Sequence, residues 1–432
     1  MQLAIYIGGA VVFFAMVMAS IALHEVGHLV PGKMFGVKTT QYFVGFGRTL
    51  WSRRKGETEY GLKLIPLGGY VRFVGMFPPA KTRPGQVRAY STGSFRSLAD
   101  NARAAEWQDI RPEDDGRLFY QKPSGQKLII MAGGPTMNLL LAFVIFLGVT
   151  ASYGVYRSQL TITRVQECIV AANATDQSCV GKPPTPAAQS GIQPQDKIVA
   201  FNGVPVSSWD EVSILIRSNL DHPAVVTVER AGQRIDLPSV NTVITGVADR
   251  YDPSKRIAAG FFGVEPQVIR ERGGPVVVLE DMWRMTKETV VALAAFPMKV
   301  YYTAYNLATG KPRDIYGPMS IVGASRAAGE VASTDQITAA DKVATLLTLL
   351  GSVNLFVALF NFVPLLPLDG GHIAGAIYEA LKRGLARLRR LPDPGHVDTA
   401  RMLPVAYVVG GVIAISGVVL ILADIIDPIR LF

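Results

Sequence analysis

The 432-residue chain is 49% hydrophobic but only 18% charged, and its 43 Lys and Arg outnumber its 34 Asp and Glu. Soluble globular domains average about 25% charged residues, so the composition excludes a soluble enzyme and a low-complexity chain. The charged residues are also spread unevenly along the sequence, which indicates a membrane protein with a large polar part.

Four stretches contain no Asp, Glu, Lys or Arg: residues 1–24, 128–156, 343–368 and 402–423. About 20 apolar residues cross the hydrocarbon core of a bilayer as a helix, and each stretch is long enough. The sequence therefore predicts a polytopic α-helical membrane protein whose four transmembrane helices cover residues 1–30, 128–156, 343–372 and 402–424. The first helix lacks the basic start of a cleaved signal peptide.

The charges between these helices predict how the chain is oriented. Residues 31–127 contain 17 Lys and Arg against 8 Asp and Glu, residues 373–401 are also basic, and residues 153–342 hold 19 of each sign. Basic loops stay in the cytoplasm. We therefore expect a multi-pass protein of the cell (inner) membrane, with residues 157–342 and the tail 425–432 outside. Binding to nucleic acid would not sort charge by membrane side, so no such partner is expected.

An HExxH motif, His24 to His28, lies at the cytoplasmic end of the first predicted helix. Residues four apart share a helix face, so both imidazoles can reach one metal ion while Glu25 acts on a bound water. Two structural histidines bonded to carbonyl groups are the alternative, but ionisable groups at membrane depth are costly and usually functional. The motif predicts Zn²⁺ bound by His24 and His28, with Glu25 catalytic.

Catalytic zinc takes three protein ligands and keeps one position open for water. Asp369 follows the third charge-free stretch, and the predicted topology puts it at the same membrane depth as His24 and His28. We expect Asp369 to be the third metal ligand. His372, three residues further on, is the competing residue.

The sequence before Asp369 predicts a break in the third helix and a polar side chain beside the metal. Pro364, Pro367 and the pair Gly370-Gly371 interrupt helices, and irregular backbone at this depth is tolerated where it lines a cavity. Asn361 carries an amide that could hold a substrate carbonyl or its oxyanion, so it is a second catalytic candidate. A helix–helix hydrogen bond is the alternative role for Asn361.

These motifs, together with Gly134-Pro135-x-x-Asn138 in the second helix, resemble the site-2 protease family of intramembrane zinc metalloproteases. The resemblance is closest to the bacterial branch with four spans and a single PDZ domain in the outward loop. It implies that Glu25 is the acid/base and that Asn361 helps to bind substrate or to stabilise the transition state. It also implies the zinc ligands His24, His28 and Asp369. Pro367 lies two residues before Asp369, whereas many relatives have this proline three before, a difference that affects only the local bend.

The cytoplasmic loop 31–127 contains a segment, about residues 37–76, in which apolar and polar residues alternate between glycines. This pattern predicts short strands and turns. The resemblance implies a membrane-associated β-sheet whose edge pairs with an extended substrate; a hairpin without further role is the alternative. The expected substrate-binding residues are Gly45, Gly47, Asn138 and Pro364. Residues 77–126 suggest no task.

The outward segment 157–268 resembles a PDZ domain in the order of its predicted elements, which include a hairpin turning at Ala231-Gly232. Such a domain binds a C-terminal peptide, or else acts as a size filter against substrates with bulky outer domains. An insertion carries Cys168 and Cys179, which form either a disulfide or two free thiols. Residues 269–342 are predicted to be an amphipathic linker on the outer membrane surface, its helix interrupted at Pro297, with a fifth span as the alternative.

The sequence therefore predicts a zinc endopeptidase that cuts transmembrane segments of single-span membrane proteins within the lipid bilayer. The resemblance implies regulated intramembrane proteolysis, with substrates such as anti-sigma factors or remnant signal peptides. Two alternatives belong to other classes. One is a non-catalytic membrane scaffold that carries a PDZ domain, and the less favoured one is a metal transporter, which would repeat its sites along a path.

Overall fold

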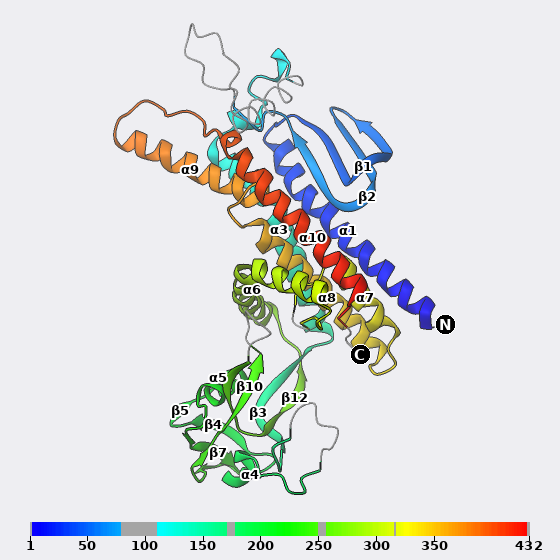
Figure 1. The fold of residues 1–432 in the computed structure, drawn as a ribbon. Helices are drawn as coiled ribbons and strands as arrows, with labels where there is room; N and C mark the ends of the chain where they lie inside the picture. Colours follow the sequence, from blue (N-terminus) through cyan, green and yellow to red (C-terminus); the bar gives the residue numbers. More distant parts are fainter. Residues whose placement is uncertain (1, 79–109, 171–177, 249–255, 315–316, 430–432) are drawn as a thin grey trace. The chain divides into compact units, whose positions relative to one another are not determined.

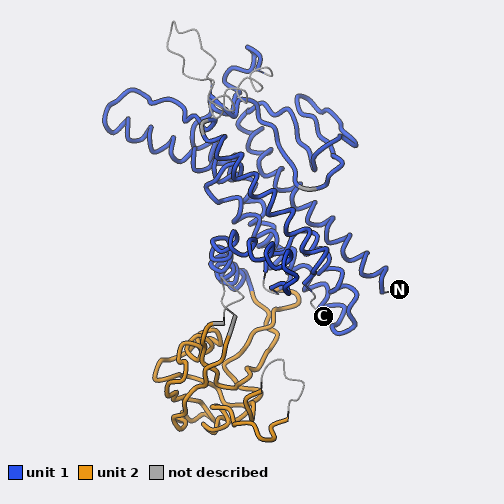
Figure 2. The backbone as a smooth tube through the Cα atoms, in the orientation of Figure 1, with its two compact units in different colours: residues 1–149, 274–432 blue, residues 150–273 orange. Residues whose placement is uncertain are grey.

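The computed structural model describes residues 2–78, 110–170, 178–248, 256–314 and 317–429. The chain forms two compact units, coloured separately in Figure 2. Unit 1 comprises Met1–Val149 and Gly274–Phe432, and unit 2 comprises Thr150–Gly273. Long helices and one β-hairpin make up unit 1, whereas unit 2 is mainly β-structure (Figure 1). Of the insert 77–126, residues 79–109 lie outside the described residues.

Four described helices of unit 1 are long and apolar enough to cross a membrane, as the sequence predicted. They are α1 (Gln2–Met34), α3 (Ser124–Ser152), α8 (Ala339–Asn361) and α10 (Leu403–Ile426). The helix α6 (Pro275–Thr309) does not belong to this set, so the alternative of a fifth span gains no support. Pro297 lies inside α6, and the predicted interruption there is wrong, because the helix continues on both sides of the proline.

The third span is shorter than predicted, because α8 ends at Asn361 and a new helix, α9 (Asp369–Leu388), begins eight residues later. The prolines Pro364 and Pro367 lie in the connecting turn, as expected. The glycines do not break the helix, however, since Gly370 and Gly371 are part of its first turn. A Cβ at either position would overlap the backbone of the turn, at Val363 and at Leu366. The two glycines therefore let the turn pack closely on α9.

Helices α1 and α3 touch through their backbones. A Cβ added to Gly27 would overlap the carbonyl of Gly133, and one added to Gly133 would overlap the carbonyl of Gly27. Small residues allow this kind of close approach between membrane helices. The contact lies one residue from His28, so it sets the position of the HExxH motif against α3.

The segment 37–76 forms one antiparallel hairpin of two long bent strands, β1 (Thr39–Lys55) and β2 (Thr58–Phe73), instead of several short strands. Because both strands fold back, residues 41–44 pair with 69–72 on one side and with 59–62 on the other. Residues 51–55 pair only with 58–62. The two edges of this sheet are therefore 69–73 and 51–55, and β2 lies beside α1 (Figure 1).

Apolar packing and hydrogen bonds to α1 hold the sheet against the helices. The hydroxyl of Tyr42 donates to the carbonyl oxygen of Ala22 at 2.8 Å. Burial and the nearby charge of Glu25 raise the pKa of Tyr42 to about 12, so its hydroxyl keeps its proton at neutral pH. A buried apolar cluster joins the sheet, the 3₁₀ turn η2 (Phe119–Gln121) and α3 through Val37, Phe73, Phe119, Ile130 and Met131.

Helix α7 (Ile321–Ser333) packs against the N-terminal half of α1, where Gly329 contacts Tyr6. Its N-terminus is held by α10. The carboxylate of Asp424 accepts hydrogen bonds from the backbone N–H groups of Ser320 and Gly323 and pairs with Arg313 at 2.6 Å. A carboxylate at a helix N-terminus satisfies N–H groups that have no partner within the helix. Shorter 3₁₀ turns are η1 (Pro112–Asp114) and η3 (Thr399–Met402).

Unit 2 is built on a six-stranded sheet with strand order β12-β3-β4-β7-β8, in which β5 pairs with β4. The sheet strands are β3 (Val155–Val165), β4 (Lys197–Phe201), β5 (Val204–Pro205), β7 (Val226–Arg230), β8 (Gln233–Asp236) and β12 (Val264–Glu271). Two-stranded pairs are β6 (Pro223–Ala224) with β9 (Val240–Asn241) and β10 (Val243–Ala248) with β11 (Arg256–Phe261). The helices are α4 (Pro186–Ser190) and α5 (Trp209–Ser218).

The core of unit 2 lies between the sheet and its helices, around Ile162, Ile198, Phe201 and Val212. The hairpin β7–β8 turns at Ala231 and Gly232, both with positive φ, as the sequence predicted. Cys168 and Cys179 are joined in a disulfide. Of the two alternatives for these cysteines, the structure therefore has the bridge.

A buried carboxylate ties the turn before β4 to β7. Arg230 donates from Nε and Nη2 to the two oxygens of Asp196, both at 2.7 Å, and the N–H of Gln193 donates to Oδ2 at 2.8 Å. Burial alone would raise the pKa of Asp196, but these bonds hold the pKa of its carboxyl below the ordinary value. A depressed pKa stabilises the fold above the unfolded value, and this stabilisation is lost as pH falls through the folded value.

We expect Asp196→Asn to lower the hydrogen-exchange protection of β4 and β7 in the full-length protein at pH 7, because Arg230 loses its charged partner. In the wild type, protection of the same strands falls below about pH 4, near the ordinary pKa of an Asp; in the variant this pH dependence is weaker. Asp221→Asn, at a carboxylate whose side chain is 67% exposed, is the control. Equal protection in all three proteins would contradict a stabilising role.

Candidate metal centre

The HExxH residues lie on one face of α1, inside a helix that is otherwise almost wholly apolar. His24, Glu25 and His28 are 8%, 9% and 5% exposed. The two imidazoles lie one turn apart, as residues at i and i+4 do, in an edge-to-face arrangement with ring centroids 4.9 Å apart. Helix α1 therefore presents two imidazoles and one carboxylate together in a buried place.

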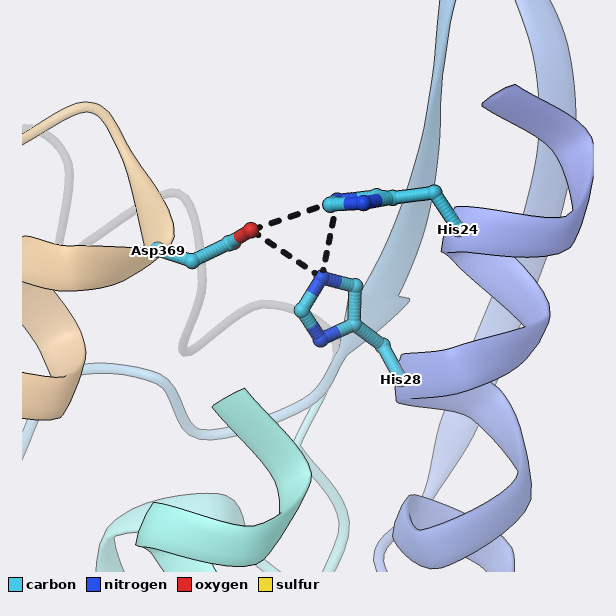
Figure 3. Close-up of side chains that lie close together, drawn as sticks. All are labelled: His24, His28 and Asp369. Carbon is cyan, nitrogen blue, oxygen red and sulfur yellow. Dashed lines mark hydrogen bonds and ion pairs between the residues drawn. The ribbon is translucent and has the colours of Figure 1, made fainter. Parts of the chain in front are cut away.

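Asp369 meets the two imidazoles from the start of α9 (Figure 3). Its Oδ2 lies 3.2 Å from Nε2 of His24 and 3.3 Å from Nε2 of His28, and the two Nε2 atoms are 3.3 Å apart. The structure thus brings Asp369 to two residues that are more than 340 positions away in sequence. His372, the competing third ligand, instead lines a pocket with Lys127 and Glu379.

A hydrogen bond fixes the tautomer of His28. Its Nδ1 lies 2.8 Å from the carbonyl oxygen of Ile130 on α3. A carbonyl oxygen only accepts, so Nδ1 carries the proton, and in the neutral ring the lone pair of Nε2 is then available to bind a metal ion. A bond from the far nitrogen to a carbonyl is the usual way of orienting a metal-binding histidine.

The arrangement of the three ligand atoms fits a tetrahedral zinc ion. Zn–N and Zn–O bonds of about 2.0–2.2 Å place ligand atoms about 3.3–3.6 Å apart in a tetrahedron, close to the three separations found here. Two neutral imidazole nitrogens and one carboxylate oxygen are also ligands that zinc accepts. With three protein ligands, a fourth position remains for water or substrate.

Gly134 on α3 leaves the room that the ligands need. A Cβ at this position would overlap Nε2 of both His24 and His28, so any larger residue would enter the space between the imidazoles. Sequence reasoning did not single out Gly134 as a site residue. The sequence signal for Gly134 was the Gly134-Pro135-x-x-Asn138 motif. It identifies Gly134 as a site residue only once α3 is known to pass directly beside the ligands.

The edge segment 69–73 of the β-sheet touches Glu25. The N–H of Val71 donates to the Glu25 carboxylate, and a Cβ on Gly69 would lie 2.9 Å from Cγ of Glu25. The sequence analysis did not identify either residue. Gly45 and Gly47, the glycines it chose, lie near the carbonyl of Ile65 and its side chain at the bend of the hairpin, and their predicted role in substrate binding stays a prediction.

The other predicted site residues lie around this cluster without joining it. Asn361 ends α8 and donates to the carbonyl oxygen of Val357 in its own helix at 3.1 Å. Asn138 is 1% exposed and lies one turn along α3 from Gly134. Pro364 is exposed in the turn between α8 and α9. Their roles in catalysis or substrate binding stay predictions.

The bundle interior beside the ligands is polar. Asn354 of α8 donates to Oγ of Ser20, which lies one turn before His24 on α1, at 3.1 Å. Within the described residues, three buried atoms here besides Oδ2 of Asp369 have no hydrogen-bond partner: Nδ1 of His24 and Oδ1 of Asn138 and of Asn354. Buried groups of this kind are usually satisfied by ordered water. This region is therefore suited to hold the water that hydrolysis consumes.

A buried ion pair anchors the helix that carries Asp369. Lys127 at the start of α3 donates to both oxygens of Glu379 on α9, at 2.9 Å, and both side chains are at most 8% exposed. The N–H of Val397 donates to the same carboxylate at 3.0 Å. Burial alone would raise the pKa of Glu379, but these bonds hold it below its ordinary value. The pair fixes α9 two to three turns after Asp369.

Comparison with known proteins gives a consistent result. Residues 12–390 match the family described as Peptidase family M50. The chain is 30% identical over 443 aligned positions to "Zinc metalloprotease Rip1" of Mycobacterium tuberculosis, with 99% of each chain covered. It is 29% identical to the protein of the same name in Mycolicibacterium smegmatis, with 98% of each covered. "Metalloprotease MmpA" of Caulobacter vibrioides is 26% identical, with 84% of each covered.

We expect Gly134→Ala to weaken zinc binding by about 10- to 100-fold, the range found when the support of a metal site is lost, because the new methyl group overlaps both imidazoles. A competition titration with a chelator on the purified protein measures this. Gly148→Ala in the same helix is the matched control, since a Cβ there meets nothing within 4 Å. Unchanged zinc affinity in the Gly134 variant would show that α3 does not approach the ligands this closely.

Proposed function

Because the chain belongs to peptidase family M50 and is a zinc metalloprotease with four membrane-spanning candidates, we propose that it is an intramembrane endopeptidase. It cuts transmembrane segments of single-span membrane proteins. One observation carries this proposal: three ligand atoms, 3.2–3.3 Å apart, meet beside a helix long and apolar enough to cross a bilayer. A peptide bond must come to this depth to be cut.

Zinc held by His24, His28 and Asp369 would supply a Lewis acid for the scissile carbonyl and would make a nearby water more acidic. Glu25 is positioned next to these residues to accept a proton from the attacking water as the water oxygen bonds to the carbonyl carbon. Glu25 then passes the proton to the amide nitrogen as the C–N bond breaks. The second proton of the water leaves the new carboxyl group for the amine, so the products are a carboxylate and an ammonium group and no proton is left on Glu25 after the cycle.

The substrate must be unwound before it reacts, because the amide groups of a helix are bonded within it. An extended substrate can add to the edge of a sheet, and the edge beside Glu25 is 69–73. The N–H of Val74, directly after β2, donates to the carbonyl oxygen of Lys38, directly before β1. N–H groups alternate in direction along a strand, so those of Val71 and Phe73 point away from β1. We therefore assign strand addition to this edge.

The proposal places the basic loops 31–127 and 373–401 in the cytoplasm and unit 2 outside a cell membrane, as the distribution of charge favours. It treats unit 2 as a single PDZ domain, which the order of helices and strands around the β7–β8 hairpin supports. The domain acts as a size filter or binds a peptide ligand. Asn361 is assigned to the substrate carbonyl or its oxyanion, supported by its position at the end of α8.

The substrates that fit this reaction are membrane proteins with one span, such as anti-sigma factors or remnant signal peptides, cut in regulated intramembrane proteolysis. A non-catalytic scaffold would need neither Glu25 beside the two histidines nor Asp369 in contact with them. A metal transporter would need further sites along a path. The described residues offer one cluster of three or more possible metal ligands, which favours the protease.

We expect purified wild-type protein to hold about one zinc per chain and to cut a single-span reporter. Glu25→Gln keeps the metal but lowers cleavage by at least about 10²-fold, because the proton acceptor is lost. Asp369→Ala loses both metal and cleavage. Metal analysis beside a cleavage assay tests this, with Glu288→Gln on the exposed side of α6 as control. Cleavage by the Glu25 variant at the wild-type rate would refute the mechanism.

We also expect a photo-crosslinking residue at Arg72, in the edge segment beside Glu25, to capture the reporter in a Glu25→Gln background. The same residue at Arg53, on the opposite edge, is the matched control, since both positions are exposed. The adduct at position 72 should exceed that at 53 by about tenfold in gel densitometry, because a bound strand lies along one edge only. Equal or reversed yields would place the substrate elsewhere.

A further inference from the structure

Helix α9 has an exposed apolar stripe opposite the face that packs on the protein. Its buried side chains after the first turn are Ala376, Glu379 and Ala386. Five large residues of the same helix are 46–82% exposed: Ile377, Tyr378, Leu381, Leu385 and Leu388. At 3.6 residues per turn these five fall within an arc of about 100°, on the side opposite the buried residues. Helix α9 thus has one face buried against the protein and a second, apolar face that the described residues leave exposed.

The end of the same helix is strongly basic. Lys382, Arg387, Arg389 and Arg390 are exposed, and no Asp or Glu occurs from residue 380 to 392. Arg383, the fifth cation, faces the protein, where it pairs with Glu379 and Asp393 at 3.4 Å. The exposed charged residues from 380 to 392 are therefore all positive and lie beside and beyond the apolar stripe, and the exposed carboxylate of Asp393 follows them.

Both ends of α9 are connected to membrane-spanning candidates. The helix begins eight residues after α8 ends, with Asp369 against the ligands on α1, and the chain enters α10 at Leu403. An apolar stripe with basic residues at its border is the pattern of a helix that contacts the bilayer surface. Tyr378 also has the amphipathic ring that is enriched at membrane interfaces.

We propose that the exposed stripe of α9 is embedded in the leaflet next to it and that Lys382, Arg387, Arg389 and Arg390 bind the headgroups of anionic phospholipids. The buried pair of Lys127 and Glu379 holds the opposite face on α3. The helix that carries Asp369 is thereby fixed between protein and lipid. This inference concerns a lipid contact and does not depend on the cleavage reaction.

A second helix, from a partner or another copy of the chain, is the rival occupant, because Tyr378, Leu381, Leu385 and Leu388 are spaced as in a coiled coil. That spacing covers fewer than two heptads, whereas coiled coils need about three or four. A helix partner would also have to match a border that carries only positive charge. Anionic lipid satisfies both the stripe and the charge.

The test uses the full-length protein in nanodiscs and an environment-sensitive dye on a single cysteine. Cys168 and Cys179 are the only cysteines and form a disulfide, so an introduced cysteine is the only thiol without reductant. Leu381→Cys reports from the stripe. Ala380→Cys is the matched control, because this neighbour is exposed but lies about 100° around the helix.

Spin-labelled phosphatidylglycerol and phosphatidylcholine, compared at equal mole fraction, quench the dye if they touch it. We expect strong quenching at position 381, weak quenching at 380, and about fivefold more effective quenching by the anionic lipid, since one basic residue near a charged surface contributes about that factor. Changing Lys382, Arg387, Arg389 and Arg390 together to Gln should bring the ratio of the two lipids close to one.

Three results would overturn the proposal. No quenching at 381 would show that lipid does not cover the stripe. Equal quenching by the two lipids in the wild-type background would show that the cations do not select anionic headgroups. Protection from quenching that increases with the number of protein copies per nanodisc would identify a second copy of the chain as the occupant.

Discussion

The backbone contact between Gly27 and Gly133 is the constraint on which the metal centre depends. It holds α1 and α3 closer than any side chain would allow. At this distance the carbonyl of Ile130 lies 2.8 Å from Nδ1 of His28 and fixes its tautomer, while Gly134 leaves the space in which the ligand atoms meet. A methyl group at any of the three glycines would separate the helices or fill that space. The imidazoles can take this position because Gly133 and Gly134 of α3 have no side chains.

The proposed third ligand is positioned in a different way. Asp369 belongs to α9, which a tight turn of seven residues separates from α8, and Gly370 and Gly371 let that turn pack on the new helix. Such a connection alone would leave the carboxylate free to move with α9. The buried pair of Lys127 and Glu379 removes this freedom, because losing either partner would leave a buried charge uncompensated. Asp369 is therefore positioned from both sides, by the turn before it and by the ion pair after it.

Much of this arrangement follows from sequence, since it rests on local periodicity and on charge. The spacing of His24 and His28 fixes their common face, and the charge-free stretches locate the helices closely enough to bring Asp369 to the same depth. The contacts of Glu25 could not be obtained in this way. Gly69 and Val71 reach Glu25 only because both strands of the hairpin bend back, so that residues 69–72 pair with residues 41–44. The bends lie at glycines far from Glu25 in sequence. The continuation of α6 through Pro297 also could not be predicted from the sequence, because tertiary packing can retain a helix that the proline alone would interrupt.

The hydrogen bond between Val71 and Glu25 connects the proposed binding of substrate to the proposed chemistry. The N–H of Val71 points away from β1, so it is the donor that an added strand would use, and in the structure it is already bonded to the carboxylate of Glu25, the proposed acid/base. One N–H cannot serve both acceptors at full strength. A substrate strand that pairs with this edge would draw the N–H away from Glu25. The same edge that would extend and align the peptide therefore contacts the carboxylate proposed to take the proton, and substrate and carboxylate would share one hydrogen-bond donor.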